Sequence, residues 1–258
     1  MSVMMPINRD FLKALMSGNS SQIRILIARG QVNANSVLRL EGDITVTPMS
    51  VCAQHGHVDA IKALAALGAS VNTPDNDVFT PVFVAAQHGH VDAIKALAAL
   101  GASVNTPDND VFTPVFVAAQ QGHVDAIKAL AALGASVITP GNNGYTPVFV
   151  AAQNGHVDAI KALAALGASV NTPGNNGCTP VFVSAQQGHV DAIKALAALG
   201  ASVITPGNNG YTPVFVAAQN GHVDAIKALA ALGASVNTPE NEGCTPVYVA
   251  TQNGHVDA

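Results

Sequence analysis

Tryptophan is absent from the 258 residues of the chain, and aromatic side chains make up only 4% of it. Charged residues are also scarce, at 10%, and the net charge is -5. Nucleic acids and anionic membranes are bound by clustered lysine and arginine, which the chain lacks, so we expect neither as a partner. Every apolar run is shorter than the roughly eighteen residues of a membrane-spanning helix, so we expect no membrane insertion.

Signals for export and for disulfide bonding are also missing. Residues 1–6 do not follow the basic-then-apolar order of a signal peptide, so we expect a cytoplasmic location. The three cysteines, Cys52, Cys178 and Cys244, are odd in number and form no CxxC pair. The sequence therefore predicts reduced thiols, with neither a disulfide framework nor a thiolate zinc site.

An internal repeat of 33 residues is the dominant feature of the chain. The sequence Gly-His-Val-Asp-Ala begins at Gly56 and returns at this interval up to Gly254, and a Thr-Pro pair keeps the same step from Thr47 to Thr245. We therefore divide the chain into a divergent leader, six full repeats and a partial repeat: residues 1–46; 47–79, 80–112, 113–145, 146–178, 179–211 and 212–244; and 245–258.

Each repeat carries the signals of two short helices. Threonine is a good N-cap and proline suits the first helical position, which predicts a helix over residues 81–88. After a Gly-His turn, a second helix runs from residue 91 to Gly101 and places Val91, Ile94, Leu97 and Ala98 on one face. Helices this short are marginal alone in water, so the repeats must stack.

The repeats resemble the ankyrin repeat. The segment Thr-Pro-Val-Phe-Val-Ala at residues 80–85 is similar to the family signature Thr-Pro-Leu-His-x-Ala, and Gly155-His156 stands at the expected place. The resemblance implies an all-α solenoid of stacked helix-turn-helix units with extended hairpin-like tips. It also implies a role in protein–protein interaction, through a concave face lined by the tips and the first-helix edge.

One departure from the family signature recurs in every repeat. Phenylalanine or tyrosine replaces the signature histidine, which in the family joins a hydrogen-bond network, so we expect aromatic stacking in its place. The replaced positions are Phe83, Phe116, Phe149, Phe182, Phe215 and Tyr248.

The leader is predicted to be a capping repeat with a long tip loop. Residues 8–16 and 20–30 align with the two helices, and Lys13, Ser20 and Arg29 replace apolar residues of the other copies. The last unit stops early in its second helix, which suggests either a longer array or another covering for that end.

No catalytic or metal site is predicted. Histidines recur every 33 residues, but an ordinary inter-helix turn explains them better than a zinc site, which needs three or four converging ligands. The Gly-Asn-Asn-Gly segments lack the Gly-Lys-Thr of a nucleotide loop, and no serine lies in a nucleophile elbow. We therefore expect a protein that is not an enzyme and that binds no cofactor.

The copies differ mainly at the tips, where six acidic residues lie. Val78 and Val111 replace a turn glycine there, so we expect these two tips to differ in backbone shape. Acidic groups beside exposed Phe79 and Phe112 would form an interface patch. Alternatively, the acids only solubilise the chain and the aromatics pack between tips. The predicted partner-binding residues are Asp75, Asp77, Phe79, His88, Asp108, Asp110 and Phe112, and more weakly Tyr145 and Tyr211.

Two functions follow as hypotheses. The first is a non-catalytic scaffold that binds another protein with a basic or aromatic surface. The second is a self-assembling repeat protein that forms a homodimer through the C-terminal end, at Val247, Tyr248 and Val256, where the last repeat leaves apolar surface.

Overall fold

The computed structural model describes residues 8–39, 45–255 and 257–258, and these contain fifteen helices and two short strands. The first helix of each repeat begins at the proline of its Thr-Pro pair and is seven residues long. These first helices are α3 (Pro48–Gln54), α5 (Pro81–Gln87), α7 (Pro114–Gln120), α9 (Pro147–Gln153), α11 (Pro180–Gln186), α13 (Pro213–Gln219) and α15 (Pro246–Gln252).

The second helix of each full repeat is nine residues long and follows the Gly-His turn. These second helices are α4 (Val58–Ala66), α6 (Val91–Ala99), α8 (Val124–Ala132), α10 (Val157–Ala165), α12 (Val190–Ala198) and α14 (Val223–Ala231). Helix α6 buries Ala93, Ile94, Ala96 and Leu97, whereas Val91 is only half-buried. The predicted face was therefore partly wrong, since Ala93 and Ala96 are buried whereas Val91 and Ala98 are half-buried.

The ends of the helices follow from the residues that cap them. At the start of α9, the Oγ1 of Thr146 accepts a hydrogen bond from the backbone N–H of Phe149 at 3.2 Å. The turn after α9 passes through Gly155, whose φ of 73° suits a residue without a Cβ. Since the same residues recur in each repeat, one local pattern sets the helix boundaries along the chain.

The leader forms the predicted helix pair and a small sheet. Helix α1 (Arg9–Met16) and helix α2 (Ser20–Ala28) are each capped by an asparagine side chain. Strands β1 (Leu38–Arg39) and β2 (Thr45–Val46) pair antiparallel in its tip. Lys13 and Arg29 are exposed and Ser20 is half-buried.

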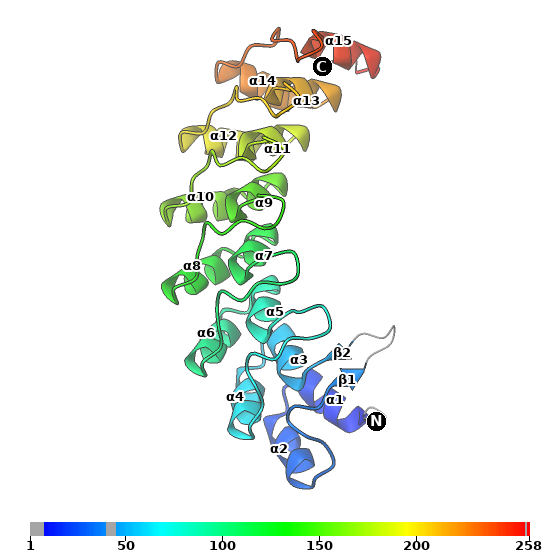
Figure 1. Ribbon diagram of the computed structural model, residues 1–258, viewed down its shortest axis with the longest axis vertical. Helices are drawn as coiled ribbons and strands as arrows, with labels where there is room; N and C mark the ends of the chain where they lie inside the picture. The colour runs from blue at the N-terminus through cyan, green and yellow to red at the C-terminus, as the bar shows by residue number, and fades with distance from the viewer. Residues whose placement is uncertain (1–7, 40–44, 256) are drawn as a thin grey trace. The chain divides into compact units, whose positions relative to one another are not determined.

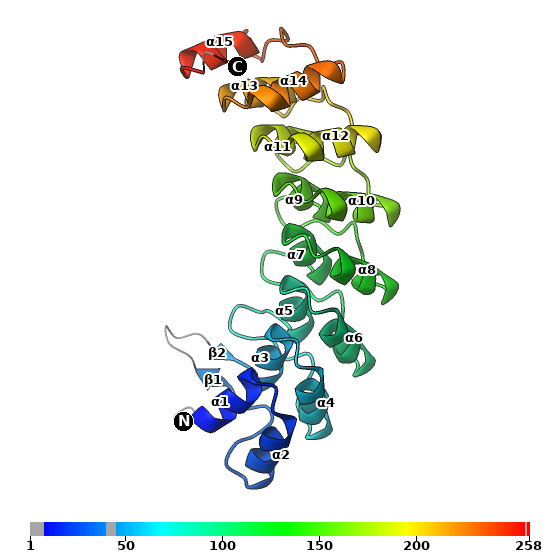
Figure 2. The same ribbon diagram turned by 180° about the vertical axis from the view of Figure 1, so that it is seen from behind.

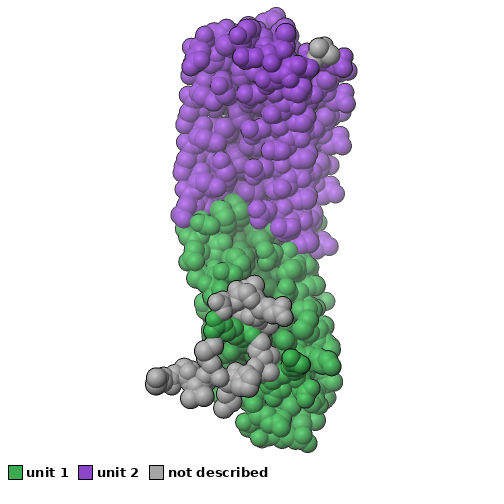
Figure 3. All heavy atoms as spheres, turned by 90° about the vertical axis from the view of Figure 1, so that its right-hand side faces the viewer, with its two compact units in different colours: residues 1–118, 128–135 green, residues 119–127, 136–258 purple. Residues whose placement is uncertain are grey.

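The chain divides into two compact units, and each is described by itself (Figure 3). The first comprises residues 1–118 and 128–135. Within it, α1 packs on α3 and α3 on α5, while α2 packs on α4 and α4 on α6. First helices therefore stack on first helices and second helices on second helices, with a contact between the two inside each repeat.

The second unit comprises residues 119–127 and 136–258 and repeats the same arrangement. Helices α9, α11, α13 and α15 follow one another, with α10, α12 and α14 beside them, as two opposite views show (Figure 1, Figure 2). The predicted all-α fold of stacked helix-turn-helix repeats is confirmed.

The cysteines are unpaired, as predicted, with Cys52 and Cys178 buried and Cys244 half-buried. Burial raises the pKa of the Cys52 thiol to about 12, because the thiolate would lose its hydration there. Cys52 is therefore a packing residue rather than a nucleophile.

Candidate functional site

Two aspartates hold the first two tips in shape. The Oδ1 of Asp75 accepts hydrogen bonds from the backbone N–H of Asp77 at 3.0 Å and of Phe79 at 2.9 Å. Asp108 makes the same pair of bonds, with Asp110 at 3.0 Å and Phe112 at 2.8 Å. Each carboxylate thus closes its own tip, because it accepts two hydrogen bonds from the backbone of the same loop.

The second aspartate of each tip is differently placed. Asp77 and Asp110 are exposed, and neither forms an ion pair within the described residues. Asp75 is half-buried, and its pKa is raised by loss of hydration and, to a smaller extent, by the nearby charge of Asp77, against the lowering effect of its backbone hydrogen bonds. The freely presented charges of these tips are therefore those of Asp77 and Asp110.

The tip aromatics are less accessible than expected. Phe79 and Phe112 are half-buried rather than exposed. Phe79 stacks on Phe83 with a centroid distance of 4.6 Å, and Phe112 stacks on Phe116 at 4.1 Å. The expectation of exposed aromatic rings was wrong, because each ring stacks on the phenylalanine in the first turn of the following helix.

The later tips use tyrosine in the same way. Tyr145 stacks on Phe149 at 4.0 Å and Tyr211 on Phe215 at 4.5 Å, and both tyrosines are half-buried. The Tyr145 hydroxyl also accepts a hydrogen bond from the Asn176 side chain at 3.2 Å. Aromatic stacking therefore occurs at four of the places of the signature histidine, Phe83, Phe116, Phe149 and Phe215, whereas Phe182 and Tyr248 follow tips that end in Cys178 and Cys244.

The backbone of the valine tips matches that of the glycine tips. Val78 and Val111 adopt φ values of 66° and 65°, and Gly144 adopts 77°. The turn bond also corresponds, from Val78 to Asp75 at 3.2 Å and from Gly144 to Gly141 at 2.9 Å. The expected difference in shape was wrong: the surrounding hydrogen bonds hold a β-branched residue in the left-handed region, at a cost in free energy.

His88 lies apart from the tip aspartates along the chain, at the C-cap of α5. Its side chain is exposed, and its ring stacks on His90 at 6.2 Å. It has further contacts and is not a free imidazole.

The repeated histidines join neighbouring repeats. The Nε2 of His189 lies 3.1 Å from the backbone oxygen of Gln153, at the end of the preceding first helix. The ring also lies against Gly155, where an added Cβ would be 2.8 Å from Nδ1. The same contact to the preceding repeat is made by His57, His90, His156 and His222.

Replacing His189 by alanine is expected to lower the free energy of unfolding by about 1–2 kcal/mol, because it removes this bond and the packing on Gly155. Urea denaturation followed by circular dichroism measures the change. His55→Asn is the control, since Asn154 makes the bond to its own helix that His55 makes. Equal stability of the two variants would show that the histidine does not join repeats.

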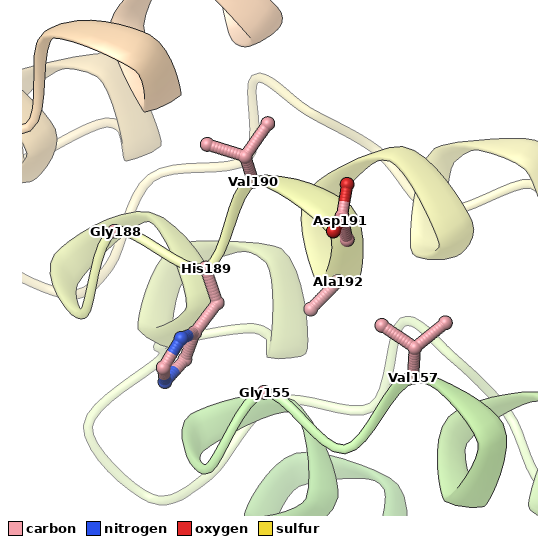
Figure 4. A pocket seen from close by; sticks show the side chains of 7 residues that line it. All are labelled: Gly155, Val157, Gly188, His189, Val190, Asp191 and Ala192. Carbon is pink, nitrogen blue, oxygen red and sulfur yellow. The ribbon is translucent and has the colours of Figure 1, made fainter.

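A hollow of about 340 Å³ lies beside His189, between the turn at Gly155 and the start of α12 (Figure 4). Asp191 is exposed at its rim. The same residue types recur in the other repeats, which is typical of a groove between stacked units. No group of three or more metal-ligating side chains is found in the part of the chain that the structure describes.

The C-terminal end presents apolar side chains. Val247 and Tyr248 on α15 are 57% and 55% exposed, whereas Val214 and Phe215 at the equivalent places of α13 are almost fully buried. Val256, the third predicted residue, lies outside the described residues.

Sequence reasoning missed a second set of differences among the copies. Ile138 and Ile204 stand where other copies carry an asparagine, and both side chains are 60% exposed. The change from Val-Asn-Thr-Pro to Val-Ile-Thr-Pro was visible in the sequence, but only the structure shows what the asparagine does.

Comparisons with known proteins agree on one family. A family model described as ankyrin repeats (3 copies) matches residues 74–141, 116–206 and 200–258, and one described as ankyrin repeats (many copies) matches residues 49–98. The crystal structure of the human ASB11 ankyrin repeat domain is similar, with a TM-score of 0.73 and 29% identity over 80% of this chain and 92% of that chain.

A search of curated protein sequences finds no significant match. Ankyrin repeats generally mediate protein–protein interaction and are typically non-catalytic. Among the described residues, every helix is too short or too polar to cross a membrane.

Proposed function

Since this chain belongs to the ankyrin-repeat family, we propose that it is a non-catalytic module that binds a partner protein through its tips and the neighbouring ends of its first helices. The observation that carries this proposal is the pair of exposed carboxylates, Asp77 and Asp110, on tips whose backbone is held by Asp75 and Asp108. We call Asp77, Asp110, His88 and the accessible edges of Phe79 and Phe112 the tip surface.

The proposed mechanism is rigid presentation of charge. Because the tips already have their hydrogen bonds, few residues need to be ordered on binding, so little conformational entropy is lost. Negative charge on this surface favours a partner with a basic patch, and its aromatic edges favour flat apolar or cationic groups. Tyr145 and Tyr211 extend this prediction to later tips, and the cytoplasmic location stays a prediction.

Changing both Asp77 and Asp110 to asparagine is expected to weaken partner capture at least roughly tenfold, because two charges leave the tip surface while its shape is kept. Capture is measured by affinity purification of partners from cell extract on the immobilised chain, with quantitative mass spectrometry. Partners held by the tips should also be lost as salt is raised.

The matched control removes two other exposed carboxylates, Asp59 and Asp92, which lie in the first turns of α4 and α6. Asp59→Asn with Asp92→Asn changes the net charge equally but leaves the tips intact. If both double variants retain the same proteins as the original chain, the tip surface is not the binding site.

The second candidate function is self-assembly through the C-terminal end. Exposed Val247 and Tyr248 favour it, because the residues at the equivalent places of α13, Val214 and Phe215, are covered. A two-fold contact between copies of this end would bury both residues and form a homodimer.

Self-assembly predicts a dimer by light scattering during size-exclusion chromatography, and Val247→Ser with Tyr248→Ser is expected to return it to the monomer mass of 26.1 kDa. The control is Ile25→Ser, which removes an exposed apolar side chain of the leader. A monomer mass for the unmodified chain at all concentrations would exclude this function.

A further inference from the structure

Asparagine side chains join the loops of neighbouring repeats through two hydrogen bonds to the backbone, an arrangement that we call the clip. The Nδ2 of Asn171 donates to the backbone oxygen of Gly200 at 3.1 Å, and its Oδ1 accepts from the backbone N–H of Ser202 at 2.9 Å. Asn72 makes the same two bonds, at 3.3 Å to Gly101 and 2.9 Å from Ser103. One carboxamide thus satisfies one acceptor and one donor of the next loop.

The clip is missing where isoleucine replaces this asparagine. Ile204 can form neither bond, and its side chain turns largely to solvent. The backbone oxygen of Gly233 and the N–H of Ser235, which correspond to the groups bound by Asn171, form no hydrogen bond within the described residues. An acceptor and a donor two residues apart therefore lack the carboxamide partner that the corresponding groups of Gly200 and Ser202 have.

A hollow of about 270 Å³ lies at this place and includes Ile204, Gly233 and Ser235 in its lining. Val203, Val214 and Ala234 form apolar walls, and Thr238 adds a hydroxyl. The hollow therefore combines apolar walls with one free backbone donor and one free backbone acceptor, which is the usual composition of a small binding pocket. We call it the Ile204 hollow.

We propose that the Ile204 hollow binds the side-chain carboxamide of an asparagine or glutamine from a partner protein. The chain itself supplies the precedent, since its own asparagines occupy the corresponding places in other repeats. A carboxylate is a poorer match because it has no N–H for the oxygen of Gly233, and an ester fails for the same reason. This surface is separate from the tip surface and does not depend on it.

The same residue types surround Ile138. Gly167 and Ser169 correspond to Gly233 and Ser235, and the Gly167 oxygen and Ser169 N–H likewise form no hydrogen bond within the described residues. Two repeats separate Ile138 from Ile204, so a partner with two suitably spaced amides could use both places. Such a partner would gain affinity from the link between its two contacts.

The test is a titration of the whole chain, labelled with 15N-serine, with propionamide as the probe. The amide signal of Ser235, and that of Ser169, should shift and saturate, whereas the signals of Ser103 and Ser202 should not, because asparagines occupy their sites. Methyl propionate, which can only accept, should bind roughly three- to tenfold more weakly. Propionate should bind more weakly still.

Ile204→Asn provides the internal control, because it should restore the clip and protect Ser235 from the probe. The response of Ser169 should remain, and the thermal midpoint should rise. Equal shifts at Ser235 and Ser202 would overturn the proposal, and so would a full response of Ser235 in the Ile204→Asn variant.

Discussion

Replacing Phe149 by alanine is expected to lower the free energy of unfolding by about 3–5 kcal/mol, the largest effect of any single change considered for this chain. The Phe149 ring is fully buried and stacks on Tyr145 at 4.0 Å. Its removal leaves a cavity and also exposes one face of the tyrosine. Urea denaturation followed by circular dichroism, fitted for midpoint and slope, measures the loss.

Tyr248→Ala is the matched control for this change. Tyr248 occupies the equivalent position of the last repeat, but more than half of its side chain is exposed, so its removal should cost less than about 1 kcal/mol. If both variants lose the same stability, aromatic burial at this position does not hold the repeats together. A changed slope without a changed midpoint would instead indicate uncoupled unfolding of repeats.

Replacing Gly144 by valine is expected to destabilise the chain by about 2–4 kcal/mol, because a β-branched residue is unfavourable at positive φ and its Cβ would collide with the Asn175 side chain. The collision would also disturb the bond from the Asn175 N–H to the backbone oxygen of Asn143, now 3.0 Å. Loss of this bond should appear as faster amide hydrogen exchange at Asn175.

The reverse change should have the opposite sign. Val111→Gly relieves the same backbone strain at a φ of 65°, against the greater flexibility of glycine in the unfolded chain, so a gain of up to about 1 kcal/mol is expected. Thermal denaturation of the two single variants is the measurement. If Gly144→Val leaves the thermal midpoint unchanged, a positive φ at this position does not disfavour a β-branched residue.

Much of the fold could be predicted because its signals are local. Thr146 and Pro147 begin a helix by capping and by a preset φ, and Gly155 ends the turn that follows, whatever the rest of the chain does. Repetition then made the stacking inference strong, since helices of seven and nine residues need neighbours. The all-α fold of stacked helix-turn-helix repeats was accordingly confirmed, whereas the capping role of the leader stays a prediction.

The candidate site was less predictable because its residues depend on contacts. Asp75 and Asp77 are the same type of residue, yet the carboxylate of Asp75 closes the loop by hydrogen bonds and that of Asp77 remains exposed. Phe79 lies at the loop end, but its ring covers Phe83. A rule based on residue type alone cannot separate these roles.

The sequence by itself determined the repeat, the family and the helix ends, because capping and turn residues act within a few positions of one another. Only the tertiary structure decided which polar groups have hydrogen-bond partners. The His189 bond to Gln153 and the Asn171 clip on Gly200 join residues about one repeat apart. Their partners are backbone atoms, which every residue has, so no pattern of side chains can reveal them before the repeats are stacked.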